Sequence, residues 1–312
     1  MLNKKSKSGK RKSGERRNSL LFFLFLLPAL FAFFMVIVIP FAIGIYYSFT
    51  DWNAITGTDV EWVGLKNYAA IFQDITFLHA FLVTTIYALV NIFTLNVAAF
   101  FLALLVTSPL KMTGMYRAGF FLPNLIGGLI LGYIWQFVFN NVIPSFGRAI
   151  GFGWLEQTLF LANRNMALLA IIIVGTWQYA GYLMMIYVAA IQGIPSSLPE
   201  AAQIDGANFW HRLRHITFPL VAPAFTVSMF LSLINSFRQF DVNFALTQGG
   251  PSGMFAGRAL MTTELLALNI YQTAFAFRQL AQGQAKAVIF FVTLVIISLI
   301  QVRINKRREI EM

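Results

Sequence analysis

Six ionisable side chains stand close together in an otherwise apolar sequence, between residues 199 and 216. They are Glu200, Asp205, His211, Arg212, Arg214 and His215. The two histidines are four residues apart, which would place both on one face of a helix, where imidazoles can hold a metal ion. A metal site needs further ligands, and no carboxylate stands at helical spacing beside this pair. We therefore expect the histidines to serve packing and not metal binding, and the residues alone leave two interpretations of the segment open: an amphipathic loop that rests on the lipid surface, or a charged surface that docks against a partner.

Three further groups combine aromatic side chains with amides or charges inside apolar runs. Amides can bind the hydroxyls of a polar solute, and aromatic faces can cover its C–H surfaces. Two alternatives stay open: Trp and Tyr near span ends also act as interfacial anchors, and Arg238 and Asp241, three residues apart, could pair with each other. The candidate pathway residues are Trp135, Trp177, Gln178, Tyr179, Tyr182, Asn235, Arg238, Gln239 and Asp241.

Several kinds of chemistry are excluded by what the sequence lacks. The chain has no cysteine, which rules out disulfides, thiol catalysis and cysteine-bound metals. It also lacks the Gly-x-x-x-x-Gly-Lys-[Ser/Thr] motif, because its only Gly-Lys pair, Gly9-Lys10, is followed by Arg11 and has no upstream glycine. The chain alone cannot grip ATP phosphates in the usual way, and we expect no cofactor in it.

The composition is that of a membrane protein. Of 312 residues, 58% are hydrophobic and 11% charged, whereas soluble domains carry about 25% charged residues. The formal net charge of +11 would suggest nucleic acid in a soluble protein, but the basic residues cluster at the chain ends and in short loops. We expect an all-α polytopic protein whose charge sets its topology and which contacts lipid, not nucleic acid.

Six apolar runs are long enough to cross a hydrocarbon core about 30 Å thick, which takes about 20 helical residues. We expect a basic tail at 1–19, a first helix with an outer loop at 20–77, a five-helix core at 78–304 and a second tail at 305–312. The first run is too long for the apolar part of a signal peptide and lacks a clear cleavage site, so we expect it to be retained. The six runs are 20–49, 78–107, 118–139, 166–191, 220–240 and 285–304.

Lysine and arginine predict the orientation of these spans. The N-terminal tail holds eight basic residues, and the loops after the second and fourth spans and the C-terminal tail are also basic. With six spans, all four regions lie on one side, while the loop after the first span carries four acidic residues against Lys66. The positive-inside rule then places both termini and the loop at 199–219 in the cytoplasm.

This loop is predicted to hold two short helices. Pro199 suits the first turn of a helix, where Glu200 complements the helix dipole. Gly206 tolerates backbone angles that are closed to other residues and would end this helix. Phe209 then begins a second helical segment, with Arg212 facing away from its apolar side. The result would be a rigid element with a small apolar knob.

The same loop resembles the EAA loop of membrane subunits in bacterial ABC importers. The family pattern is Glu-Ala-Ala, three residues, Gly, and a hydrophobic segment closing on Ile-x-Leu-Pro. Stretches such as "LTQGGP" and "AGFFLPNLIGGLILGYIWQFVF" extend the resemblance to the maltose-type subfamily, which imports sugars and related polar solutes. Phe218 stands where Leu is usual, and the matching residues are Glu200, Ala201, Ala202, Asp205, Gly206, Ala207, Ile216 and Pro219.

The resemblance implies an ABC type I importer fold with six transmembrane helices and a cytoplasmic coupling helix. It also implies a bacterial plasma-membrane location, a second homologous permease subunit and an extracytoplasmic solute-binding protein. The chain would be a transport subunit and not an enzyme, with ATP and Mg bound by a separate ATPase, expected as a dimer. The residues implied to dock on that ATPase are Glu200, Ala201, Ala202, Asp205, Gly206, Ala207 and Phe209.

Two other classes of membrane protein fit less well. An ion-coupled carrier acting without an ATPase would favour carboxylates in mid-span, yet Asp and Glu are nearly absent from the apolar runs, and it gives no reason for the EAA loop. A membrane enzyme would show clustered His or acidic residues at one membrane face, and the sequence shows no such cluster. The solute is left open among sugars, polyols and glycerol phosphates.

Overall fold

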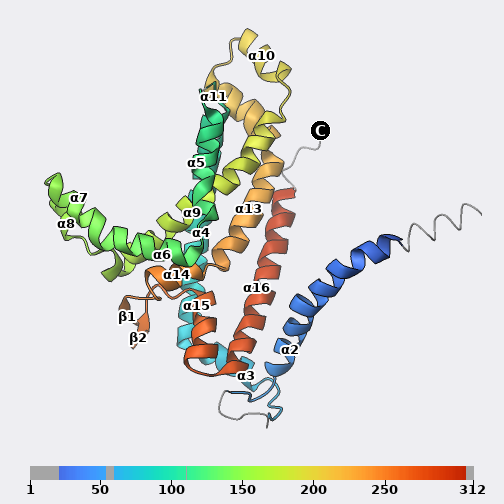
Figure 1. Ribbon diagram of the computed structural model, residues 1–312, viewed down its shortest axis with the longest axis vertical. Helices are drawn as coiled ribbons and strands as arrows, with labels where there is room; N and C mark the ends of the chain where they lie inside the picture. Colours follow the sequence, from blue (N-terminus) through green and yellow to red (C-terminus); the bar gives the residue numbers. More distant parts are fainter. Residues whose placement is uncertain (1–20, 54–59, 110, 307–312) are drawn as a thin grey trace, which may run out of the picture.

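The structure is a computed structural model that describes residues 21–53, 60–109 and 111–306. The predicted tail at 1–19 and nearly all of the one at 305–312 lie outside the described residues. Figure 1 shows a bundle of helices with a small hairpin of strands β1 (Ser252–Phe255) and β2 (Arg258–Met261), which pair antiparallel. This confirms the prediction of an all-α membrane fold, since the hairpin is a minor addition to the helices.

The helical elements follow one another along the chain. The first membrane helix, Leu21–Tyr47, is continuous and includes the segments labelled η1 and α2. In chain order they are η1 (Phe34–Val38), α2 (Ile39–Tyr47), α3 (Lys66–Gln73), α4 (Ile75–Thr107), α5 (Thr113–Leu125), α6 (Gly128–Phe137), η2 (Val138–Val142), α7 (Ile143–Ala149), α8 (Gly153–Gln157), η3 (Phe160–Ala162), α9 (Arg164–Gln192), α10 (Ser197–Ile204), α11 (Phe209–Arg212), η4 (Leu213–Thr217), α12 (Phe218–Leu220), α13 (Ala222–Phe237), α14 (Asp241–Leu246), α15 (Leu266–Tyr271), η5 (Gln272–Ala276) and α16 (Leu280–Lys306).

The described residues hold five helices that are long and apolar enough to cross a membrane. A bent pair, Phe209–Leu220 and Ala222–Phe237, meets at 68° and would make a sixth span. This number agrees with the six apolar spans predicted from the sequence. The five unbroken helices are Leu21–Tyr47, Ile75–Thr107, Gly128–Ala149, Arg164–Gln192 and Leu280–Asn305.

The third predicted span, 118–139, is wrong as one continuous helix. α5 ends at Leu125, the backbone is extended at Ile126 and Gly127, with ψ of 127° and 135°, and α6 begins at Gly128. α5 has only 13 residues, and its helix of about 20 Å is too short to cross a membrane alone. In Figure 1, α6 and α7 leave the bundle at a steep angle to α5. The chain therefore bends sharply where the sequence predicted an uninterrupted crossing.

The two ends of the bundle carry different elements. α10 stands at one end, and α5 begins and α16 ends at this same end (Figure 1). α3, α15 and the start of α16 lie at the opposite end. The basic residues after the second span, in the loop after the fourth span and near the end of the last span therefore share one end of the molecule, as their positions in the sequence predict.

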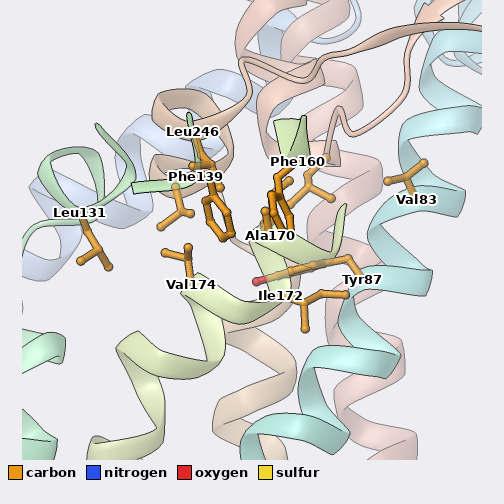
Figure 2. Packing of buried hydrophobic residues seen from close by; sticks show 12 residues of the cluster. Val83, Tyr87, Leu131, Phe139, Phe160, Ala170, Ile172, Val174 and Leu246 are labelled. Atoms are coloured by element: carbon orange, nitrogen blue, oxygen red, sulfur yellow. The ribbon is translucent and has the colours of Figure 1, made fainter. Parts of the chain in front are cut away.

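α4 and α9 form the centre of the bundle. Figure 2 shows Tyr87 extending from α4 towards α9, among buried residues that include Val174 and Phe160. Small residues on α9 let neighbouring helices approach closely. At Gly181, for example, any Cβ would collide with the backbone carbonyl of Phe120 on α5. The packing of α4, α5 and α9 thus depends on side-chain size as much as on hydrophobicity.

The first helix, Leu21–Tyr47, lies apart from the bundle for most of its length (Figure 1). Its contacts with the bundle are made near its end, where Phe41 lies 4.7 Å from Phe291 between ring centroids. Gly44 of the first helix faces the side-chain amide of Gln284, which lies on α16 as Phe291 does. An apolar helix with an exposed surface of this kind needs lipid or another membrane protein as its surroundings.

Candidate docking loop and membrane pathway

The loop between α9 and α13 folds as two short helices joined by a defined turn. The amide of Gly206 donates to the carbonyl of Gln203 (3.1 Å), and the amide of Ala207 donates to the carbonyl of Ala202 (2.8 Å). These bonds form a Schellman motif, which needs a residue in the left-handed conformation just after the helix. Gly206 fills that place with φ of +81°. The prediction that this glycine ends the helix is confirmed.

Side chains hold the second short helix against the first. Asn208 caps α11, because its Oδ1 accepts a hydrogen bond of 2.8 Å from the amide of His211. Arg212 Nη1 donates to Gln203 Oε1 at 2.9 Å. The guanidinium of Arg212 thus connects α11 to α10, a contact that the sequence did not predict. Sequence reasoning passed over Asn208, although an Asn directly before a helical segment is a recognisable cap signal.

The loop exposes an apolar tip. Ile204 is 87% exposed, Trp210 68% and Phe209 53%, and neither α10 nor α11 has a buried residue. Among the residues predicted to dock, Ala202 and Ala207 are half-buried by the turn that they form. The other predicted docking residues, Glu200, Ala201, Asp205, Gly206 and Phe209, are exposed. Clustered apolar side chains on a protruding loop mark a surface that contacts another protein or a membrane.

A hollow of about 470 Å³ lies between the two helices of the loop, beside His211, Arg212 and His215. The two imidazole rings stack with centroids 4.2 Å apart, and His215 Nδ1 lies 3.0 Å from the His211 carbonyl. Within the described ranges, no group of three or more possible metal ligands is found, here or elsewhere. The histidines thus contribute packing and polar surface to the wall of the hollow.

Two interrupted helices meet in the interior of the bundle. One interruption separates α5 from α6, and the other separates α13 from α14. A Cβ on Gly128 would lie 2.6 Å from the Cβ of Asp241, and a Cβ on Gly132 would lie 2.5 Å from that of Ala245. Only glycine therefore allows α6 and α14 to pack so closely, so this glycine pair serves helix packing.

Amide side chains satisfy backbone carbonyls at the α5–α6 interruption and at the end of α14. Gln178 Nε2 donates to the Ile126 carbonyl, and Gln136 Nε2 donates to the Leu246 carbonyl, each at 3.3 Å. Backbone carbonyls without partners are costly at membrane depth, so broken helices persist there only with such support. Gln178, a predicted pathway residue, is buried and stabilises the break from within the bundle.

The predicted aromatic residues Trp135 and Trp177 come together from different helices. Their ring centroids are 5.5 Å apart in an edge-to-face arrangement. Trp177 and Thr176 also line a groove of about 860 Å³ between α4, α5 and α9. Trp177 is 43% exposed, so one side of this pair stays free for a further contact.

The predicted charged residues, Arg238 and Asp241, lie near Tyr179 of α9. The Tyr179 hydroxyl interacts electrostatically with both Asp241 and Arg238. Both of these residues are exposed on the isolated chain. In the described part of the chain, the ion pairs are Arg148 with Glu156 and Lys286 with Asp74, so Arg238 and Asp241 do not pair with each other.

The remaining predicted pathway residues are less exposed than Arg238 and Asp241. Gln239 is buried, and its Nε2 lies 3.5 Å from the hydroxyl of Tyr87. Tyr182 and Asn235 are half-buried, and Tyr182 packs against the apolar cluster around α4 and α9. The structure thus forms two separate groups, Trp135 with Trp177 and Tyr179 with Arg238 and Asp241, while the buried amides of Gln178 and Gln239 take supporting positions.

The geometry combines a firmly hydrogen-bonded loop between α9 and α13 with broken helices inside a membrane bundle, and comparison with known proteins agrees with it. The family described as "Binding-protein-dependent transport system inner membrane component" matches residues 8–310. The chain belongs to this family. The family consists of transport components, which confirms the predicted permease subunit and disfavours the enzyme and ion-coupled carrier alternatives.

Curated relatives of this permease cover nearly its whole length. The probable starch degradation products transport system permease AmyD of Thermoanaerobacterium thermosulfurigenes is 45% identical, over 95% of this chain and 97% of the relative. The multiple sugar-binding transport system permease MsmF of Streptococcus mutans is 31% identical, over 87% and 90%. A bacterial ABC transporter that imports the acidic polysaccharide alginate has the same fold, with a TM-score of 0.78 and 21% identity, over 95% of this chain and 99% of that one.

The permease also contains a buried polar junction that sequence reasoning missed. Asn96 of α4 donates to Ser232 Oγ at 3.0 Å and accepts 2.7 Å hydrogen bonds from Ser228 of α13 and Tyr187 of α9. α9 and α13 are the two helices from which the docking loop is suspended. Asn96 therefore ties both supports of the loop to α4, and its signal in the sequence is an Asn in the middle of an apolar run.

Proposed function

We propose that this permease forms half of a membrane pathway for a sugar or related polar solute, and that a second, homologous permease subunit supplies the other half. The carrying observation is that Arg238 and Asp241 are exposed on the single chain at the level of Tyr179, in the middle of α9. A charged side chain facing hydrocarbon costs about 2.5–3.5 kcal/mol or more. These residues are therefore expected to face water, solute or a second subunit.

The broken helices support a solute pathway at this level. In membrane transporters, interrupted helices commonly mark binding sites because their free backbone groups and short dipoles face the substrate. Here the α5–α6 and α13–α14 interruptions bring Asp241 beside Gly128, at the start of α6. Trp177 adds an exposed aromatic face on α9, which suits the C–H surface of a sugar ring.

We further infer that the α10–α11 loop docks on a separate ATPase that binds ATP and Mg. The Schellman turn, the Asn208 cap and the bond between Arg212 and Gln203 make the loop a rigid body. The apolar tip of the loop, formed by Ile204, Phe209 and Trp210, is exposed to water on the single chain, and binding to the ATPase would bury it. Because Asn96 joins α9 and α13 to α4, a push on the loop would move these three helices together.

The relatives support the solute class and the remaining partners. AmyD and MsmF are named for starch degradation products and multiple sugars. A related fold is known from a bacterial alginate ABC transporter in complex with a periplasmic protein that holds an alginate pentasaccharide. By this analogy, an extracytoplasmic binding protein delivers the solute at the end opposite α10, and both termini lie in the cytoplasm of a bacterium.

Reconstitution tests this proposal directly. The permease is purified with its second subunit and candidate ATPase, placed in proteoliposomes and supplied with a loaded binding protein and radiolabelled maltodextrin. Uptake is expected only with ATP, and it should stop when the phosphate-binding lysine of the ATPase is replaced. Uptake that continues without the ATPase would contradict the proposal.

A further inference from the structure

Lys286 is a fully satisfied cation buried at the end of the molecule opposite α10. Its ammonium donates to Asp74 Oδ2 at 2.8 Å, Thr273 Oγ1 at 2.9 Å and Asn269 Oδ1 at 3.0 Å. An ammonium has three N–H donors, so each one has a partner. The side chain is 3% exposed, and its Nζ lies 5.6 Å from the ring centre of Phe77.

Asn269 links this cation to a second carboxyl group. Its Oδ1 accepts from Lys286, and its Nδ2 donates to Glu264 Oε1 at 3.0 Å. The two ends of one amide thus face a cation and a carboxyl group, which fixes the orientation of the amide. Glu264 is 7% exposed and follows the hairpin in the loop between α14 and α15.

The backbone around Glu264 is held on both sides. Asn243 of α14 donates to the carbonyl of the preceding residue at 2.8 Å and accepts from the amide of the following residue at 3.0 Å. Thr84 of α4 accepts from the amide of Leu266 at 2.7 Å. A Cβ on Gly249 would lie 3.2 Å from the Cβ of Glu264, so the loop also packs tightly from its other side. Glu264 cannot turn to water without moving the loop.

The cluster contains two carboxyl groups and one cation. Asp74, at the start of α4, takes the direct contact with Lys286 and also accepts from the amide and hydroxyl of Thr76 at 2.9 and 2.6 Å. Burial alone would raise the pKa of Asp74, but the hydrogen bonds from Lys286 and Thr76 and the charge of Lys286 hold it below its ordinary value. Asp74 therefore stays ionised and neutralises Lys286.

Glu264 is left with a surplus negative charge if it ionises. Burial raises the pKa of Glu264, the charge of Asp74 raises it further, and together they outweigh the lowering by Asn269 and Lys286. Lys286 and Asp74 are the charged groups that act on it from the neighbouring elements, α16 and the start of α4. A proton on Glu264 would leave the buried cluster with no net charge.

We propose that Glu264 is a proton-binding site that locks the loop at 247–279, which carries the hairpin, against α4 and α16. The proton comes from the water at this end of the molecule and forms an O–H bond with the carboxylate. As the pH there rises, the proton leaves, an uncompensated negative charge is buried, and the packed arrangement of the loop weakens. This inference does not depend on the proposed function, because it concerns one chain and one proton.

Infrared titration of the full-length protein in lipid nanodiscs tests the site. The carbonyl stretch of a protonated carboxyl group is followed in wild-type protein, in Glu264→Gln and in Glu61→Gln, an exposed glutamate that serves as the matched control. We expect a band that persists above the ordinary titration range of glutamate, is lost in Glu264→Gln and is kept in Glu61→Gln. A band that survives Glu264→Gln, or no such band in the wild type, would overturn the proposal.

Two neighbouring substitutions separate a proton site from a merely structural cluster. Asp74→Asn removes a negative charge of nearly unchanged shape, so the Glu264 band should titrate at lower pH. Lys286→Met removes the cation, so the band should titrate at higher pH. Each shift should be about one pH unit or more, a tenfold change in proton affinity. Shifts in the same direction, or none, would contradict the assignment, and Asp74→Asn alone decides it if Lys286→Met does not assemble.

Discussion

The amide of Ala207 donates a 2.8 Å hydrogen bond to the carbonyl of Ala202, so the first helix of the docking loop ends at a fixed turn. This bond gives the spacing of the EAA pattern a structural reason. Ala202 supplies the carbonyl, Gly206 supplies the left-handed residue, and Ala207 closes the motif. The loop is thereby a rigid part whose shape depends on one glycine.

Gly206→Ala should weaken coupling through backbone strain. A side chain at φ of +81° costs about 1–2 kcal/mol, which would distort the turn between α10 and α11. We expect fewer solute molecules imported per ATP hydrolysed, with normal insertion into the membrane. Gly114→Ala is the matched control, because Gly114 lies in α5 with open space around it. Equal coupling in the two variants would contradict the role given to the turn.

Arg238 and Gln239 are neighbours in sequence, but substitutions of the two residues should affect different properties, solute binding for Arg238 and thermal stability for Gln239. Arg238 is exposed, so Arg238→Gln should raise the KM for solute by about tenfold, or about 1.4 kcal/mol, without loss of stability. Gln239 is buried against Tyr87, so Gln239→Leu should lower the unfolding temperature first. Solute kinetics and thermal unfolding of both variants provide the measurement. If only Gln239→Leu changed KM, Arg238 would have no place in the pathway.

Asn96→Leu should separate ATP hydrolysis from transport. Leu has the same branching and number of side-chain heavy atoms as Asn but no hydrogen-bonding group, so the change removes the junction between α4, α9 and α13, which should cost about 1–2 kcal/mol of stability. We expect ATP hydrolysis to continue while uptake falls, because the helices that carry the loop no longer move together. The exposed Asn140 provides the control substitution Asn140→Leu. A parallel loss of hydrolysis and uptake would mean that Asn96 serves folding alone.

The stability of the permease should depend on pH through Glu264. The pKa of this group is raised in the packed loop, so its proton stabilises the loop at low pH, and that contribution is lost as pH rises through the raised pKa. Asp74 has a lowered pKa, so its contribution is lost only at more acidic pH. The unfolding temperature of the wild-type protein should fall as the pH rises through the raised pKa of Glu264. In Glu264→Gln, the unfolding temperature should depend less on pH. An unchanged slope would refute this account of the pH dependence.

The sequence predicted the docking loop well because its signals are local. Gly206, Pro199 and Glu200 act on the backbone within a few residues of themselves, so their spacing alone carries the structure. Long apolar runs likewise predict membrane helices directly. The sequence analysis did not predict the helix break at residues 126–127, because the residues on both sides of it are apolar. Pro123 and the Gly127–Gly128 pair are turn signals that indicate such a break.

The pathway and the buried cluster could be predicted only in part, because they depend on tertiary packing. The direction of Gln178 is set by a carbonyl 52 positions earlier in the chain. Lys286 stands near the start of the last apolar run, but its partners come from α15, η5 and the residue before α4. No periodicity within one segment contains this information.

The most direct test of the central claim is a crosslink from the tip of the docking loop. Because the chain has no native cysteine, Ile204→Cys introduces a single reactive thiol at a position that is 87% exposed. Met254→Cys, on the hairpin and also exposed, is the control at a distance from the loop. We expect Ile204→Cys to crosslink to the ATPase and Met254→Cys not to do so. A crosslink to the ATPase from residue 254, with none from residue 204, would contradict the account.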